Sequence, residues 1–172
     1  MRIRALTGAL TMAMAALSIP ALAAPPREQV FDVPGFADFL AVDGDSVWVT
    51  NAGRVERWSR KGRLAQVAMS KPCGAMAILD GSLWVADCKE NALVRIDTDK
   101  AVKTATIATG LASTGELNVV AGAGSVWVAS DNVAGAIARV DPATNAVIAT
   151  ITVDPGTWYL AFGHGYLWAV SS

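Results

Sequence analysis

The chain has 172 residues, of which 53% are hydrophobic, and 14 Lys and Arg face 15 Asp and Glu for a formal net charge of −1. This balance provides no basic stripe that could follow a phosphate backbone, so the composition argues against a nucleic-acid partner. The length suits one ordinary domain.

Residues 1–23 have the pattern of an export signal. Two arginines near the start precede an uncharged apolar run over 5–19, and Ala21-Leu22-Ala23 then places small residues where signal peptidase reads them. The run is shorter than the ~20 apolar residues that a membrane helix needs, which favours cleavage after Ala23 over a membrane anchor. Without the two arginines, 12 basic residues face 15 acidic ones. We expect a periplasmic or secreted protein with no membrane span after cleavage.

Four segments of the chain share one pattern, in which β-branched and aromatic residues surround a tryptophan and a turn precedes them. The tryptophans stand at 48, 84, 127 and 168, so the repeat is 36, 43 and then 41 residues long. A period near forty with several strands per unit is typical of a β-propeller blade. The segments are Ser46–Asn51, Ser82–Asp87, Ser125–Asp131 and Tyr166–Ser171.

The chain order predicts an all-β protein, with residues 24–172 forming a β-propeller repeat domain of four-stranded antiparallel blades and no helix after the signal. A lone outer strand is expected over 28–33, and the first inner strand over 36–42. The last unit offers only two strands before the sequence stops. About three and a half blades result, in an open or truncated propeller, over 36–69, 74–108, 116–153 and the partial 157–172.

Each predicted blade is a twisted meander that cannot bury both faces alone and must stack on its neighbours. We expect the repeat tryptophans to pack between blades rather than to bind a ligand, because burial of so large an aromatic ring dominates core energetics. The apolar faces of the first and last blades would then be exposed. A homo-oligomer could cover them, although two copies of 15 expected strands give 30, which is not a multiple of four.

The unit S-V-W-V-A-S-D … I-A-R-V-D-P-A-T-N-A-V-I-A-T-I-T-V over 125–153 resembles the exported YVTN/YncE-like β-propeller repeat family. It is more loosely similar to the streptogramin (virginiamycin B) lyase propellers. The resemblance covers 28–172 and implies the propeller fold. Members of such families close with about seven blades, so the resemblance implies a partial copy.

The lyase resemblance implies a catalytic His with an acidic partner and Mg²⁺, in a P-H-G-x-A pattern at the start of an inner strand. The nearest match begins at Pro72, where Cys73 takes the place of the histidine. The single histidine, His164, falls in a turn at the opposite end of an inner strand. No catalytic residue is therefore carried over from the resemblance.

The two cysteines are expected to form a disulfide, because an even count in an exported protein favours a bridge. If Asp80-Gly81 is a two-residue hairpin turn, Cys73 stands directly opposite Cys88. Opposed Cβ atoms lie about 4.5–5.5 Å apart, close to bonding range. A free thiol pair or a redox switch is the alternative, and no C-x-x-C spacing supports it.

Aspartates recur at matching positions of the repeat, and we interpret them as turn formers that bond the backbone rather than as metal ligands. No glycine-rich loop precedes a helix, and no Ser or His occurs in the context of a catalytic triad. The sequence thus predicts no catalytic, metal-binding or cofactor-binding residue. The aspartates are Asp43, Asp45, Asp80, Asp87, Asp131 and Asp141.

A ligand surface, if present, is expected where the connections from second to third strands and from outer to next inner strands converge over the central channel. The alternative is that these polar loops are solvated connections. The candidate residues on this face are Asn51, Lys71, Lys89, Glu90, Asp131 and Asn132.

These observations favour an exported, non-enzymatic binding or scaffold module whose partner is a protein, a peptide or a cell-envelope component. The first alternative is a lyase-like or other metal-assisted propeller enzyme whose catalytic residues lie in blades absent from this chain. The second is an inactive truncated fragment, which the two-stranded last unit suggests.

Overall fold

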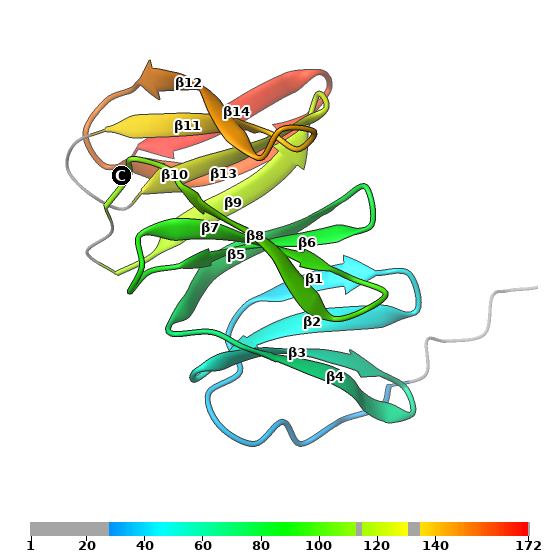
Figure 1. The fold of residues 1–172 in the computed structure, drawn as a ribbon. Helices are drawn as coiled ribbons and strands as arrows, with labels where there is room; N and C mark the ends of the chain where they lie inside the picture. Colours follow the sequence, from blue (N-terminus) through cyan, green and yellow to red (C-terminus); the bar gives the residue numbers. More distant parts are fainter. Residues whose placement is uncertain (1–27, 113–114, 131–134, 172) are drawn as a thin grey trace, which may run out of the picture.

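The computed structural model describes residues 28–112, 115–130 and 135–171, which form 14 strands and, within these ranges, no helix. The strands make three four-stranded antiparallel sheets and one two-stranded sheet (Figure 1). Each sheet is a meander in which consecutive strands pair, as predicted for propeller blades. None of the described residues lies in a helix long and apolar enough to span a membrane.

The sheets follow one another along the chain, and we number them as blades 1 to 3 and a terminal hairpin. Blade 1 contains β1 (Leu40–Asp43), β2 (Ser46–Asn51), β3 (Arg54–Ser59) and β4 (Gly62–Ala68). Blade 2 contains β5 (Pro72–Leu79), β6 (Ser82–Asp87), β7 (Ala92–Asp97) and β8 (Val102–Ala108). Blade 3 contains β9 (Leu117–Gly122), β10 (Ser125–Ser130), β11 (Ala136–Asp141) and β12 (Ala146–Thr152). The terminal hairpin is β13 (Thr157–Gly163) and β14 (Tyr166–Ser171).

Two-residue turns join the two inner strands of successive blades. Asp80-Gly81, at φ 49° and 67°, and His164-Gly165, at φ 53° and 79°, have both central residues in the left-handed region. This conformation matches the right-handed twist of the flanking strands and suits the Asp-Gly pair especially well. The hairpin turn expected at Asp80 is therefore present.

The blades pack face to face, and each repeat tryptophan lies on the side of its blade that meets the next one. We call this side the Trp face. Trp48 is buried against Leu83 and Val85 of blade 2, and Trp84 is buried in a cluster shared with blade 3. Trp127 is 9% exposed and contacts a cluster that includes Leu160 of the terminal hairpin. The prediction that tryptophans fill the layers between blades is thus confirmed for these three.

The N-terminal stretch differs from the prediction. Residues 28–33 form no strand, and the first inner strand begins at Leu40 rather than at residue 36. The ring of Phe31 packs 6.3 Å from the ring of Trp58, on the side of blade 1 opposite its Trp face. In this stretch Phe31 packs on the sheet face through its ring, although it remains 38% exposed, and the backbone joins no ladder.

The register of the β5–β6 pair also differs from the prediction near its open end. Ala77 pairs with Trp84 as expected, but Cys73 pairs with Ala86 instead of Cys88, because the register shifts between Cys73 and Ala77. Three residues of β5 lie between these two pairs but only one residue of β6, so the extra residues of β5 interrupt the ladder. The two cysteines are nevertheless joined, with their Cα atoms 5.9 Å apart.

The stack of blades is open. Blade 1 and the terminal hairpin lie at opposite ends of it, with blade 2 between blade 1 and blade 3 (Figure 1). Trp168, the fourth repeat tryptophan, is 56% exposed, and the described residues form no blade that covers it. The expectation that both end faces are exposed is confirmed at this end, and at the other end Leu40 and Val42 are 64% and 72% exposed.

Candidate functional site: a pocket at the channel mouth

A pocket of ≈ 370 Å³ opens where the connections into three inner strands converge. Phe36 and Asp38 come from the segment before β1, Lys71 from the β4–β5 connection, and Glu116 from the residue before β9. Asn51, at the end of β2, completes one wall. This is the face on which the sequence predicted a ligand surface.

The connection that carries Lys71 is held by a buried aspartate. Asp87, only 2% exposed, ends β6, and its carboxylate accepts hydrogen bonds from the backbone N–H groups of Ser70 (2.9 Å) and Lys71 (3.1 Å). The same carboxylate accepts from the N–H groups of Lys89 (3.1 Å) and Glu90 (3.4 Å). Charge-assisted bonds of this kind fix the loop backbone strongly. The position of Lys71 at the pocket is therefore set by the fold.

Asn51 takes the corresponding place in blade 1. Its Oδ1 accepts from the N–H groups of Phe36 and Ala52, both at 2.8 Å. Its Nδ2 donates to the carbonyl of Pro34 (2.9 Å) and to Glu56 Oε2 (3.2 Å). The side chain is thus occupied by internal contacts and holds the segment that carries Phe36.

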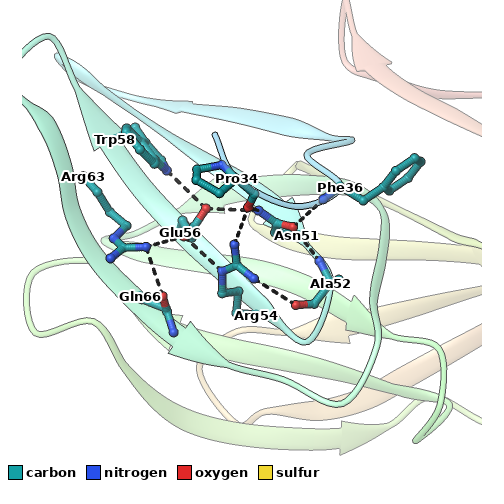
Figure 2. Close-up of polar contacts among 9 residues, drawn as sticks. All are labelled: Pro34, Phe36, Asn51, Ala52, Arg54, Glu56, Trp58, Arg63 and Gln66. Carbon is teal, nitrogen blue, oxygen red and sulfur yellow. Dashed lines mark hydrogen bonds and ion pairs between the residues drawn. The ribbon is translucent and has the colours of Figure 1, made fainter. Parts of the chain in front are cut away.

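A buried carboxylate anchors this arrangement (Figure 2). The side chain of Glu56 is 0% exposed, and its Oε1 accepts from Arg54 Nε at 3.0 Å and from Arg63 at 2.8 Å. Trp58 Nε1 donates to Oε2 at 3.4 Å. Burial alone would raise the pKa of Glu56, but the hydrogen bonds from Arg54, Arg63, Asn51 and Trp58 together lower the pKa from 4.5 to about 2.

The carboxylate occupies a position that is aliphatic in the other blades. Glu56 pairs with Val49 on the second strand of blade 1, and the equivalent third-strand positions are Val94 in blade 2 and Ala138 in blade 3. Both of those side chains are buried beneath the preceding blade. Blade 1 has no preceding blade among the described residues, and the Pro34 segment lies over this position instead (Figure 2).

The pocket combines an aromatic wall with charged groups. Phe36 is 71% exposed, and its ring points away from the Glu56 network (Figure 2). Gly74 lies in the wall with φ 67°, and a Cβ at this position would overlap the backbone of Leu117. This close approach of blades 2 and 3 needs glycine. Together with Lys71 and two carboxylates, the pocket can hold an apolar group beside a polar or charged one.

The disulfide lies at the same end of the molecule. Cys73 contributes to the pocket wall, and the N–H of Cys88 donates to the carbonyl of Lys71 at 2.9 Å. The bridge thus ties the first residues of β5 to the turn that follows β6.

Of the residues that the sequence placed on the ligand face, some line this pocket and others lie outside it. Asn51 and Lys71 line the pocket, whereas Lys89 and Glu90 are exposed on the β6–β7 turn outside its wall. Glu90 accepts a hydrogen bond from Ser70 Oγ at 3.1 Å. Asp131 and Asn132 lie outside the described residues. Sequence reasoning did not identify three other residues of the lining, Phe36, Asp38 and Glu116. The break at Pro34-Gly35 was an available signal for Phe36 and Asp38, and no such signal precedes Glu116.

His164 stands in the β13–β14 turn, exposed, and distant in the chain from the pocket residues. Within the described ranges, no three or more His, Cys, Asp or Glu side chains gather closely enough to hold a metal ion.

No protein-family model matches the chain, and no curated protein matches it in sequence. Solved structures do. A streptogramin B lyase structure aligns at a TM-score of 0.68 with 18% identity, covering 82% of this chain and 51% of that one. The chain has the β-propeller fold. It spans about half the length of that lyase.

Two further solved structures resemble this chain at lower sequence identity. The computationally designed Ika4 protein aligns at a TM-score of 0.65 with 11% identity, covering 83% of this chain and 95% of that one. The WD40 domain of Neurospora crassa Pan2 aligns at 0.54 with 14% identity, covering 69% and 36%. At such identities the likeness establishes the fold of this propeller, and its activity has to be argued from its own residues.

Proposed function

We propose that this propeller is an exported binding module of the YVTN/YncE-like kind, and that it holds a protein, a peptide or a cell-envelope component in the channel-mouth pocket. The observation that carries the proposal is the construction of the pocket. Loops from three successive blades converge there, and the buried side chains of Asn51 and Asp87 fix two of those loops. A preformed concave site with a few fixed polar groups is typical of a binding site.

Export is supported by two independent features. The disulfide between Cys73 and Cys88 is typical of an oxidising compartment. Residues 1–23, which lie outside the described residues, carry the signal-peptide pattern. We expect the mature protein to begin at residue 24.

A lyase-like enzyme remains the alternative to be tested against binding. Its support is the structural likeness to streptogramin B lyase, of which the chain spans 51%. Such an activity would need catalytic side chains from further blades, since His164 lies in the β13–β14 turn. An inactive fragment would show neither binding nor turnover.

Photo-cross-linking in the organism of origin tests the binding proposal. A photoreactive amino acid replaces Phe36 at the pocket, and the same amino acid replaces Leu64, which is 54% exposed on β4, as the control. We expect a discrete adduct with another molecule from position 36 and none from position 64. Adding Lys71→Glu should lower the yield at position 36 several-fold, whereas Lys103→Glu on β8 should leave it unchanged. Equal adducts at both positions, or none, would contradict the proposal.

A further inference from the structure

We propose that the outward face of the terminal hairpin docks onto the first blade of a second copy of this chain, head to tail. The hairpin face consists of Tyr159, Tyr166, Trp168 and Val170, which are 53%, 68%, 56% and 59% exposed. The cross-strand pairs Tyr159–Val170 and Ala161–Trp168 put these residues on one side of the β13–β14 sheet. The face is contiguous, apolar and two strands wide.

The repeat shows what normally covers such a face. The hairpin face is the Trp face of the last unit, and in the three preceding blades the equivalent tryptophans are 0%, 0% and 9% exposed. In each case the next sheet supplies the covering residues from its opposite side. For Trp48 these residues include Met76 on β5 and Leu83 and Val85 on β6. The partner of the hairpin face must therefore present aliphatic side chains from two adjacent strands.

The chain carries a matching surface at its other end. Leu40 and Val42 on β1 are 64% and 72% exposed, and Val47 on β2 is half-buried. The pairs Leu40–Val49 and Val42–Val47 put these side chains opposite the Trp face of blade 1. We call Leu40, Val42 and Val47 the first-blade face. Val47 corresponds in the repeat to Leu83, which covers Trp48 at the first junction.

The widths of the two faces agree. The N-terminal segment covers the outer part of the same side of blade 1, where Phe31 packs on Trp58 and the carbonyl of Pro34 accepts from Arg54 at 2.6 Å. Glu56, on the same side, is fully buried. On this side of blade 1, only β1 and the adjoining part of β2 stay uncovered by the described residues. The hairpin face is likewise two strands wide.

A second copy is the occupant that these faces favour. Within one copy, blade 1 and the hairpin lie at opposite ends of the stack, so the hairpin face cannot reach its own first-blade face (Figure 1). Two copies related by a two-fold axis along the channel would each use both faces once. Each hairpin–blade contact joins two different faces, and the two-fold axis repeats this contact once, so that the assembly ends at a dimer. Each copy contributes three four-stranded sheets and one two-stranded sheet, so the ring of two copies would contain eight sheets, with each hairpin between two complete blades.

The oligomeric state of the secreted, processed protein tests this inference. Sedimentation velocity over a range of concentrations should show a dimer. Trp168→Asp, which alters the hairpin face, and Val42→Asp, which alters the first-blade face, should each give a monomer. Leu64→Asp introduces the same charge at an exposed position on β4 and should leave the dimer intact. Circular dichroism and the intact disulfide serve as checks that each variant is folded, and Val170→Asp replaces Trp168→Asp if the latter is not.

A mixing experiment separates the head-to-tail arrangement from other dimers. When the Trp168→Asp and Val42→Asp variants are mixed, one copy contributes an intact hairpin face and the other an intact first-blade face, so one junction is restored. We expect the mixture to dimerise although neither variant does alone. A monomeric parent protein, a dimer that survives both substitutions, larger open assemblies, or a mixture that stays monomeric would each overturn the inference. Cross-linking from position 36 reports binding at the pocket independently of the oligomeric state, so the two proposals can fail separately.

Discussion

The guanidinium carbon of Arg95 lies 5.0 Å from the centroid of the Trp84 ring, and the same stacking recurs in blades 1 and 3 at 5.7 and 5.0 Å. Arg95 also donates from Nε to Ser82 Oγ at 2.9 Å and from a terminal nitrogen to the carbonyl of Pro142 at 2.7 Å. The arginine thus fixes the tryptophan within its own blade and bonds to a turn of the next blade. Charge-assisted bonds and stacking make it a joint between neighbouring sheets.

Arg95→Ala should therefore destabilise the protein by about 2–3 kcal/mol, since it removes the stacking and the hydrogen bonds to Ser82 and Pro142. Urea unfolding followed by circular dichroism measures the change. Arg139→Ala is the matched control, because Arg139 stacks on Trp127 and donates a hydrogen bond to Ser125 in the same way. The described part of the next sheet has no third strand, and therefore no turn whose carbonyl could accept a hydrogen bond from Arg139. An equal loss in both variants would contradict the role of Arg95 as a joint between blades.

The strands were largely predictable because their signals are local. Glycine and aspartate mark the turns, and β-branched residues alternate between them, so the bounds of β2, β6 and β14 follow from the letters. The same reasoning was wrong for 28–33, which pairs with no strand although Phe31 packs on Trp58. It was also wrong for the register at Cys73, because counting back from a turn assumes that no bulge intervenes.

Glu56→Gln should lower stability by about 2–3 kcal/mol at neutral pH, because it leaves the Arg54 and Arg63 guanidinium groups without their carboxylate. The folded-state pKa of Glu56, at about 2, is below its ordinary value of 4.5. The ionised form therefore stabilises the fold fully above about pH 4.5, and this contribution is lost as the pH falls towards 2.

The measurement is the difference in unfolding free energy between the parent protein and Glu56→Gln at several pH values. We expect the difference to be largest at pH 7 and to shrink below pH 4.5. Hydrogen bonds from the backbone N–H of Lys100 and of Ala143 also lower the pKa values of Asp97 and Asp141, so the parent protein alone would show a composite pH dependence. A difference that stays constant down to pH 2 would contradict the role of the Glu56 charge.

The pocket was harder to predict than the strands, because its wall depends on how three blades are placed relative to one another. Lys71 was found since it stands in a connection on the expected face. Phe36 and Glu116 were instead assigned to inner strands, and nothing in their immediate neighbours shows that they meet across the channel mouth. Asn51 lines the pocket as well, and its side-chain oxygen accepts a hydrogen bond from the backbone N–H of Phe36, a contact that its sequence position alone does not indicate.

Reduction of the disulfide should lower stability by about 2–3 kcal/mol, since Cys73 and Cys88 close a loop with a separation of 15 residues. Urea unfolding with and without a thiol reductant measures this. The double variant Cys73→Ala, Cys88→Ala should be insensitive to the reductant. A parent protein that is equally insensitive would show that the bridge contributes nothing to stability.

Gly74→Ala tests the approach of blades 2 and 3 beside the pocket. The new Cβ would overlap the backbone of Leu117, and φ at this residue is 67°, so we expect a loss of about 3–4 kcal/mol. Gly81→Ala is a close control, because Gly81 has the same φ of 67° but nothing within 4 Å of an added Cβ. Backbone strain alone should cost Gly81→Ala about 1–2 kcal/mol. Since the overlap involves backbone rather than a movable side chain, equal losses in the two variants would mean that blades 2 and 3 do not meet at Gly74.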